Sequence, residues 1–205
     1  MIAMNKRQLR KEIRARHEGM DARNTQSRRI CHHILQSEVY QSARVVAGYM
    51  PLPQEADVTE VLQAVLRSGK TLVLPLCESA SRMTLRRVAA LEELIPGAYG
   101  ILEPKADAPV IPVDEVDLLL VPLEGIDEDG YRLGKGGGYY DHLLAEASPM
   151  TIGCALSWQR VKALPREEWD VPLTACADWK GLHYFKNKDI GKEKHHGCKE
   201  EQAED

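Results

Sequence analysis

Residues 130–141, GYRLGKGGGYYD, hold five glycines within nine positions, two cationic side chains and a final aspartate. Glycine has no Cβ, so successive backbone N–H groups in such a stretch can approach an anion closely. Arg132 and Lys135 would add full positive charges beside the same anion. The segment is neither a GxxxxGK[ST] loop nor a GxGxxG turn followed by an acid about twenty residues later. We interpret it as a phosphate-binding turn, with a purely structural role for the glycines as the alternative.

A row of cations lies near the N-terminus. Lys6, Arg10 and Arg14 recur at every fourth position, so a helix would stack them on one face. Like charges at this spacing destabilise an isolated helix by a few tenths of a kcal/mol, and a bound phosphate chain would turn that repulsion into binding. The alternative is a solvated basic face, because Arg7 and Lys11 make the helix basic all round.

Two acids complete the set of residues that could do chemistry. Asp141 ends the glycine-rich turn. Asp170 lies in LPREEWDVPL, directly after a tryptophan and two positions before a proline. Magnesium bound with a nucleotide takes one or two carboxylates together with phosphate oxygens and water. A pair of carboxylates from separate loops would serve, whereas helix capping or solvation is the alternative role for each aspartate alone.

Alternating helices and apolar strands must position these residues. Helical patterns cover 5–17, where Asn5 is a good N-cap, and 21–37, 58–69 and 139–147. In the third of these helices, Asp57 or Thr59 can cap the N-terminus. Apolar runs typical of buried strands cover 43–50, 71–77, 83–90, 116–123 and 151–157.

This alternation predicts an α/β protein, a three-layer α/β/α arrangement with a mostly parallel central sheet. The glycine-rich turn follows strand 116–123 directly and precedes a helix. Ligands of open parallel sheets bind beyond the carboxyl ends of the strands, where the helix N-terminus adds a partial positive charge. The turn is therefore expected at the ligand-binding edge of the sheet.

Length and composition predict a single α/β domain over 1–185, followed by a charged, disordered tail over 186–205. In that tail, His195 and His196 stand near Cys198, and we favour a solvated tail over a metal site there. The net charge is −4 and the pI is about 6.0, which excludes general nucleic-acid binding. Any polyanion must therefore meet a local cluster of cations.

Neither a membrane span nor a signal peptide is visible in the chain. The five cysteines are odd in number and widely scattered, which argues against a disulfide framework and for a reducing cytoplasm. No local signature marks any of them as a nucleophile. We expect a cytoplasmic protein that binds neither membranes nor nucleic acid.

Taken together, the motifs resemble those of the 5-formyltetrahydrofolate cyclo-ligase family, also called 5,10-methenyltetrahydrofolate synthetases. GIDEDGYRLGKGGGYYDHLL resembles the family signature G-x-D-x-x-G-x-R-L-G-x-G-x-G-Y-Y-D. The resemblance extends to the N-terminal K-x-x-x-R, to YMPLPQEADV after the first strand and to WDVPL near the end. It covers roughly residues 4–182 and implies a fold related to the sugar-phosphate isomerase and CoA-transferase folds.

The resemblance implies an enzyme that converts 5-formyltetrahydrofolate, with ATP and Mg²⁺, into 5,10-methenyltetrahydrofolate, ADP and phosphate. The formamide oxygen is a poor leaving group, so the ATP γ-phosphoryl group is first transferred to it. N10 then attacks the formyl carbon and phosphate departs. Such a reaction needs positioning and charge neutralisation more than a strong base.

Site roles follow from the resemblance position by position. The implied ATP-binding residues are Lys6, Arg10, Arg132, Leu133, Gly134, Lys135, Gly136, Gly137, Gly138, Tyr139 and Tyr140. The implied folate-binding residues are Met50, Glu55, Lys135, Gly136, Gly137, Gly138 and Tyr139. The implied catalytic residues are Arg132, Lys135 and Tyr139, and the implied Mg²⁺ ligands are Asp141 and Asp170. Glu55 suits its role, because a carboxylate can accept paired hydrogen bonds from the amino-pyrimidine edge of a pterin; a solvent-facing loop acid is the alternative.

Two positions depart from the family pattern. Many members carry arginine or an aromatic residue where Lys135 stands, and arginine where this chain has His142. Lysine keeps the charge but loses the bidentate fork of arginine, so both departures are expected to tune binding and leave the reaction intact.

The expected partners are ATP and 5-formyltetrahydrofolate, with or without a polyglutamate tail. The protein itself is expected to be a monomer. Two alternatives remain open at this stage: a folate- or nucleotide-binding relic without turnover, and a phosphosugar isomerase of related fold. A relic should have lost Asp141, Arg132 or Lys6, and all three are present. An isomerase would need no ATP and would have little use for the cations at Lys6 and Arg10.

Overall fold

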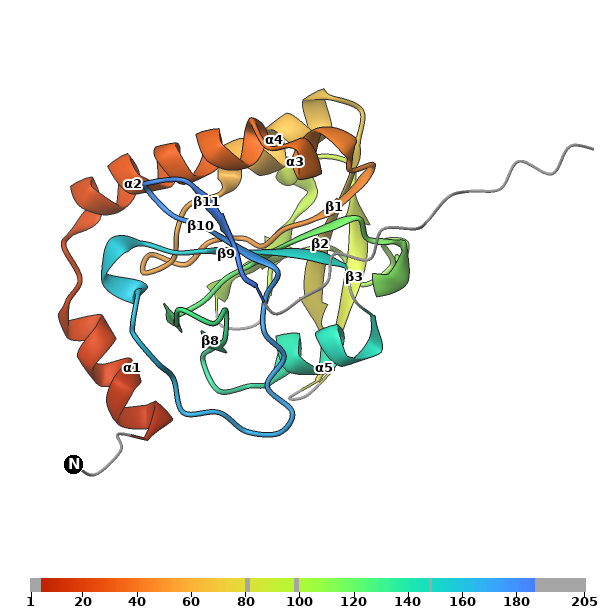
Figure 1. Ribbon diagram of the computed structural model, residues 1–205. Helices are drawn as coiled ribbons and strands as arrows, with labels where there is room; N and C mark the ends of the chain where they lie inside the picture. Colours follow the sequence, from red (N-terminus) through yellow and green to blue (C-terminus); the bar gives the residue numbers. More distant parts are fainter. Residues whose placement is uncertain (1–4, 80–81, 98–99, 148, 187–205) are drawn as a thin grey trace, which may run out of the picture.

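The computed structural model describes residues 5–79, 82–97, 100–147 and 149–186 (Figure 1). Its centre is a seven-stranded sheet in the order β11-β10-β9-β6-β1-β2-β3. The strands span Val45–Ala47 (β1), Thr71–Cys77 (β2), Met83–Val88 (β3), Leu118–Val121 (β6), Met150–Cys154 (β9), Ala175–Ala177 (β10) and Leu182–Tyr184 (β11). All neighbours from β10 to β2 pair in parallel, and the edge strands β11 and β3 pair antiparallel. The predicted α/β class and mostly parallel sheet are confirmed.

Two short hairpins stand apart from the main sheet. One pairs β4 (Ile95–Pro96) with β5 (Leu102–Glu103), and the other pairs β7 (Gly125–Ile126) with β8 (Arg132–Leu133). The second hairpin holds the beginning of the glycine-rich turn, because Arg132 and Leu133 pair with Ile126 and Gly125.

The α-helices span Lys6–Ala15 (α1), Met20–Leu35 (α2), Glu38–Ser42 (α3), Thr59–Arg67 (α4) and Tyr139–Glu146 (α5). Short 3₁₀ turns cover Leu91–Glu93 (η1), Val113–Glu115 (η3) and Ser157–Gln159 (η4). Helix α1 begins as predicted, because the Asn5 side chain accepts the Gln8 N–H while the Gln8 side chain accepts the Asn5 N–H. Two orphan donors of the helix end are thereby satisfied.

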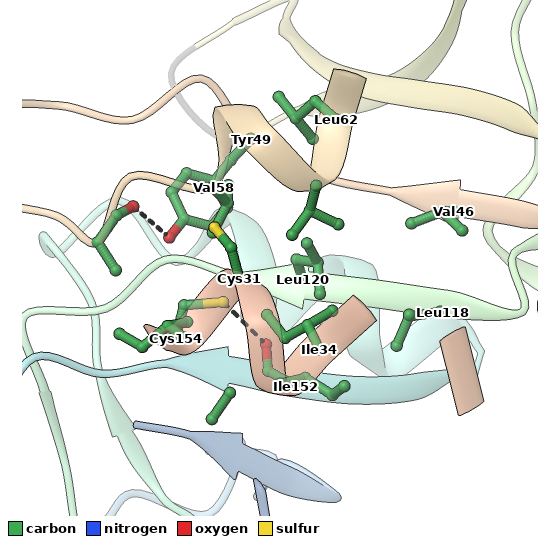
Figure 2. Packing of buried hydrophobic residues seen from close by; sticks show 14 of the residues in the cluster. Cys31, Ile34, Val46, Tyr49, Val58, Leu62, Leu118, Leu120, Ile152 and Cys154 are labelled. Carbon is green, nitrogen blue, oxygen red and sulfur yellow. Dashed lines mark hydrogen bonds between the residues drawn. The ribbon is translucent and has the colours of Figure 1, made fainter. Parts of the chain in front are cut away.

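Helices cover both faces of the sheet. On one face, α2 and α4 pack on alternate strand residues such as Val46, Leu118 and Leu120 (Figure 2). On the opposite face, Leu143 and Leu144 of α5 pack on the intervening residues. Both sets of strand residues are buried, since successive side chains of a strand point to opposite faces. Figure 1 shows α2 and α4 above the sheet and α5 below it.

The helices and strands expected from the sequence are present; β2 has the predicted bounds, whereas the other predicted strands are shorter than their apolar runs. β1, for example, occupies only Val45–Ala47 of the predicted 43–50. Asp57 accepts the Thr59 N–H at 3.0 Å, yet the N-cap residue of α4 is Val58. Strands of two or three residues, such as β7, β8, β10 and β11, were not expected, because so short a run carries no readable period.

The predicted tail, 186–205, lies outside the described residues except for Lys186, and so do His195, His196 and Cys198. In the part of the chain that is described, no helix combines the length and the apolar character needed to cross a bilayer.

Candidate active site

A cleft of about 440 Å³ opens at the carboxyl ends of the parallel strands. Its walls include Tyr49 and Met50 after β1, Cys77 at the end of β2, and Pro122 and Leu123 after β6. The glycine-rich turn and the first turn of α5 form a further wall. The cleft therefore lies where a doubly wound sheet is expected to bind its ligand.

The turn between β8 and α5 follows a path that favours glycine. Gly136 has φ +106° and Gly138 has φ +67°, a region that a Cβ makes costly for other residues. Gly138 is the N-cap residue of α5 and has no side-chain cap. The turn thus leads its bare backbone into a helix N-terminus, an arrangement suited to an anion.

Arg132 is the buried cation of this wall. Its side chain is 4% exposed, and its guanidinium donates to Asp141 Oδ1 at 2.7 Å and to the Val171 carbonyl at 3.0 Å. Burial lowers the pKa of Arg132, and the neighbouring Asp141 carboxylate opposes that shift. Arginine stays protonated even so, which places a fixed positive charge beside Asp141.

Lys135 reaches across the cleft. Its Nζ lies 2.8 Å from Glu55 Oε1, and the buried Glu55 also accepts the Leu52 N–H at 2.8 Å through Oε2. A residue of the glycine-rich turn is thereby joined to the segment that follows β1. Both oxygens of Glu55 already hold one donor from the protein.

Two buried side chains fix the segment that carries Glu55. The Tyr49 hydroxyl donates to the Ala56 carbonyl at 2.9 Å (Figure 2). The Arg23 guanidinium of α2 donates to the Glu55 carbonyl at 2.7 Å. Because these anchors bond the carbonyls of Glu55 and of the next residue, the Glu55 carboxylate is held in place before a ligand arrives.

The three stacked cations of α1 have separate partners. Lys6 pairs with Glu167 at 2.7 Å and with Asp170 at 2.8 Å, and Arg10 donates to the Gly134 carbonyl at 2.8 Å. Arg14 makes a two-pronged pair with buried Glu124, at 2.9 and 2.5 Å. Each cation of the row is therefore held by a different segment of the protein, and Arg14 is paired with Glu124.

The Lys6–Asp170 pair joins two segments that are 164 residues apart in the sequence. Partial burial would lower the pKa of Lys6, but hydrogen bonds to Asp170 and Glu167 outweigh it and raise that pKa. The Asp170 carboxylate also accepts the Glu167 N–H at 2.8 Å, which shapes its own loop. Lys6 is therefore a charged residue held beside one of the two predicted metal ligands.

The structure gathers the predicted site residues into one region, in two groups. The first group consists of residues that line the cleft: Met50, Glu55, Arg132, Gly134, Lys135, Gly137, Gly138, Tyr139, Tyr140 and Asp141. Lys6, Arg10, Gly136 and Asp170 lie beside it and contact its residues or each other. Leu133 differs, because its side chain is buried in the hydrophobic core and only its backbone faces the hairpin.

The tyrosines after the glycines point in different directions. Tyr139 donates from its hydroxyl to the Ser79 carbonyl at 3.0 Å, linking the turn to the end of β2. Burial, with Glu55 nearby, raises the pKa of Tyr140. The Tyr140 phenol therefore stays protonated at neutral pH and can donate or accept a hydrogen bond.

A bound metal would need to rely on few protein ligands. Within the described residues no three His, Cys, Asp or Glu side chains converge as a metal cage. Asp141 and Asp170 are both tied to cations of the site, Arg132 and Lys6. Two carboxylates, one in the first turn of α5 and one on a loop, fit Mg²⁺ that is bound largely through phosphate oxygens and water, and do not fit a metal held by protein alone.

Several cleft residues were missed at the sequence level. Glu103 of β5, Cys77 of β2 and Glu124 after β6 all line the cleft. Cys77 and Glu124 stand at or just beyond the carboxyl ends of strands, a position that could have marked them. For Glu103, the only signal in the sequence was its position as an acid inside the apolar run GILEP.

Known proteins resemble this chain over most of its length. The 5-formyltetrahydrofolate cyclo-ligase of Escherichia coli K12 is 36% identical over 139 residues, which are 65% of this chain and 76% of the relative. That of Haemophilus influenzae is 30% identical over 181 residues, 84% of this chain and 97% of the relative.

Solved structures agree. The NMR structure of Aquifex aeolicus 5,10-methenyltetrahydrofolate synthetase superposes with a TM-score of 0.79 at 31% identity, covering 95% of this chain and 100% of the other. A Mycoplasma pneumoniae 5,10-methenyltetrahydrofolate synthetase has the same fold, with a TM-score of 0.69 at 23% identity, covering 85% of this chain and 99% of the other.

The family profile itself decides the assignment. It describes the 5-formyltetrahydrofolate cyclo-ligase family and matches residues 2–177, a span that holds α1, the cleft and the glycine-rich turn. On this match, and on the fold and relatives that accompany it, the chain belongs to the 5-formyltetrahydrofolate cyclo-ligase family.

Proposed function

We propose that this chain closes the ring of 5-formyltetrahydrofolate to give 5,10-methenyltetrahydrofolate, at the expense of ATP and with release of ADP and phosphate. One observation carries the proposal beyond the family assignment. Lys135 of the glycine-rich turn and Glu55 of the predicted folate wall meet at 2.8 Å. The predicted nucleotide and folate positions therefore share one cleft, as direct phosphoryl transfer between them requires.

The first step forms a bond between the γ-phosphorus and the formyl oxygen while the bond to the β-phosphate oxygen breaks. Negative charge spreads over the transferred group and accumulates on the departing ADP. Arg132 and Lys135 supply positive charge in the wall of the cleft, and the turn from Gly134 to Gly138 supplies backbone N–H groups. We assign these groups to holding the phosphates in line with the formyl oxygen.

The second step forms the bond from N10 to the formyl carbon. The N10 proton is lost, and the carbon–oxygen bond breaks to release inorganic phosphate. A phosphorylated oxygen leaves easily, so the protein need only hold N10 against the carbon and exclude water. The apolar walls formed by Met50, Leu123 and Tyr140 suit that task.

Lys135 is the residue we place closest to the transferred group. It is held by Glu55 across the cleft, while Glu55 is itself fixed through Tyr49 and Arg23. A lysine ammonium is a point charge on a flexible side chain, so a partner is needed to fix its position. The Glu55 carboxylate provides that partner and offsets part of its charge before ATP enters.

Asp141 and Asp170 would hold Mg²⁺ together with the phosphate oxygens, and the ion would neutralise charge on the β- and γ-phosphates. Each carboxylate is held by a cation in the protein, Asp141 by Arg132 and Asp170 by Lys6. The two cations thereby keep both acids oriented toward the nucleotide and limit their mutual repulsion.

We further propose that the enzyme acts as a monomer in the cytoplasm. All four cysteines in the described ranges are unpaired, which supports a reducing compartment.

The test is product formation, followed by the absorbance of methenyltetrahydrofolate. Purified protein with 5-formyltetrahydrofolate should give product only when ATP and Mg²⁺ are both added. Asp141→Asn keeps an acceptor for Arg132 but removes the negative charge, so we expect activity to fall by about a hundredfold or more. The matched control is Asp117→Asn, because Asp117 bonds the backbone N–H groups of Arg44 and Val45 away from the cleft.

Folded protein that binds ATP and 5-formyltetrahydrofolate without making product would contradict the proposal and indicate a binding protein without turnover. Product formation in the absence of ATP would contradict the phosphoryl-transfer mechanism.

A further inference from the structure

Five acids of the described chain have buried side chains, and four of them are neutralised within the protein. Glu55 pairs with Lys135, Glu124 with Arg14, Asp127 with Arg166, and Asp178 with Arg160. The fifth is Glu103, which is 6% exposed. Among the described residues, the ion pairs that neutralise the other four acids have no counterpart at Glu103. Burying a carboxylate without a cation is costly.

The surroundings of Glu103 are those of a ligand wall. The residue lines the active-site cleft, together with Cys77, Met83 and Leu102. Within the described ranges, the donor beside it is the Cys77 thiol, a weak one, and burial together with Glu103 raises the pKa of that thiol to about 11. The carboxylate therefore retains most of its capacity to accept hydrogen bonds.

The chain around Glu103 is built to accommodate the carboxylate. β5 pairs with β4, which places Ile95 opposite Glu103, and the Gly97 N–H donates to the Ile101 carbonyl at 2.8 Å. A Cβ on Gly97 would stand 2.1 Å from Glu103 Oε2. The glycine leaves room for the acid, so the position of the carboxylate is set by the backbone of the hairpin.

Glu55 and Glu103, both in the wall of the cleft, differ in what they can still accept. Glu55 already holds Lys135 and the Leu52 N–H, one on each oxygen. Tyr140 lies near both Glu55 and Cys77, and each contributes to raising the pKa of its phenol. Glu103, next to Cys77, lines the same cleft as the Glu55–Lys135 pair.

We infer that Glu103 is a specificity-determining residue, whose carboxylate accepts the two adjacent N–H donors of the 2-amino-4-oxopyrimidine ring of the reduced pterin. The inference rests on the proposed function and refines it, because it moves recognition of the pterin edge from Glu55 to Glu103. A carboxylate matches two parallel N–H donors well, and a ligand that supplies them removes the cost of the buried charge. The opposite side of the pterin, with the formyl group, then faces Lys135 and the glycine-rich turn.

The test compares substrate binding in Glu103→Gln and wild type. The glutamine amide has the same size as the carboxylate, but its NH₂ group replaces one accepting oxygen. One of the two hydrogen bonds to the pterin is therefore lost, and the NH₂ group faces an N–H donor of the ring. We expect the Kd for 5-formyltetrahydrofolate, measured by calorimetry without ATP, to rise about tenfold to a hundredfold. The KM for ATP and the kcat at saturating folate should stay within about twofold, since the lost contact is made equally before and during reaction.

Glu78→Gln is the matched control, because Glu78 follows β2 outside the cleft lining and pairs with Arg86. We expect its Kd for 5-formyltetrahydrofolate to match that of wild type. A Kd raised as much as in Glu103→Gln would mean that loss of any carboxylate in this part of the fold weakens binding and would overturn the inference, as would an unchanged Kd in Glu103→Gln.

A substrate analogue lacking the 2-amino group identifies which donors are bound. Wild type should bind it about tenfold or more weakly than the natural substrate, whereas Glu103→Gln should show a much smaller difference between the two. Equal losses in both proteins would overturn the assignment of Glu103 to this edge. If wild type binds 5-formyltetrahydrofolate but forms no product, the proposed function fails while these binding measurements still decide the role of Glu103.

Discussion

Arg132 illustrates how much of the site depends on the shape of one side chain. Its guanidinium bonds Asp141 on the helix α5 and the Val171 carbonyl on the loop that follows Asp170. These two contacts come from separate segments and leave the side chain 4% exposed. The residue therefore holds together the two segments that carry the proposed Mg²⁺ ligands, in addition to supplying charge.

Arg132→Lys keeps the charge but removes the fork that spans both acceptors. One charge-assisted hydrogen bond is lost in a buried place, so we expect kcat/KM to fall about tenfold to a hundredfold. The apparent affinity for Mg²⁺ should fall as well, because Asp141 and the Asp170 loop lose their common anchor.

The matched control is Arg160→Lys, since Arg160 also pairs with a buried aspartate, Asp178, outside the cleft. Steady-state kinetics at varied Mg²⁺ and thermal melts of both variants make the comparison. Equal effects on kcat/KM in the two variants would show that Arg132 acts only through general stability.

Among the elements of the fold, the turn between β8 and α5 is rich in glycine but follows a defined backbone path. Gly138 adopts φ +67° as the N-cap of α5, and the nearest atoms to an added Cβ are those of His142 at 3.8 Å. Space is therefore available for a methyl group there, and only the backbone conformation opposes it. A substitution at Gly138 therefore tests the effect of the left-handed backbone conformation without adding a steric clash.

Gly138→Ala should cost about 1 kcal/mol of stability through the left-handed backbone. Since relief of that strain would move the turn and the start of α5, we expect the KM for ATP to rise about tenfold. Gly69→Ala is the control, because Gly69 has φ +74° after α4 with nothing within 4 Å of an added Cβ.

Urea unfolding and ATP kinetics distinguish the two variants. Both should lose similar stability, and only Gly138→Ala should lose affinity for ATP. A Gly138→Ala enzyme with wild-type kinetics would argue against the turn as the phosphate-binding element.

At the scale of the whole molecule, the buried thiols make folding sensitive to alkaline pH. Burial raises the pKa of Cys31 and of Cys176 to about 12, from an ordinary value of 9.0. Both residues lie in the core, Cys31 on α2 and Cys176 on β10. In the unfolded chain these thiols would ionise near their ordinary pKa, whereas in the folded protein they remain neutral.

Stability should therefore be constant below about pH 8.5 and fall as the pH rises past 9, because unfolding then releases protons. Each of the two thiols contributes a loss of up to about 1.4 kcal/mol per pH unit in this range. Urea unfolding between about pH 7 and pH 10 measures the slope. The Cys31→Ala, Cys176→Ala double variant should be less stable at neutral pH but show a shallower slope, and an unchanged slope would contradict this account.

Much of this protein can be read from its sequence. The glycine-rich turn, the cations at Lys6 and Arg10 and the acids Asp141 and Asp170 are all recognisable in the printed chain. So are the main helices and strands, because their patterns are local and repeat with the period of the backbone. The parallel sheet follows from the alternation of these elements, and with it the edge where a ligand binds.

Only the tertiary structure decided which of these residues meet. Lys6 bonds Asp170 across a separation of 164 residues, Lys135 bonds Glu55, and Arg14 turns out to be occupied by Glu124. That no cation of the described ranges forms an ion pair with Glu103 is likewise invisible in the sequence, since it depends on every side chain that the fold brings near. Such contacts are set by strand order and helix packing between distant segments, for which no local pattern of the chain carries a signal.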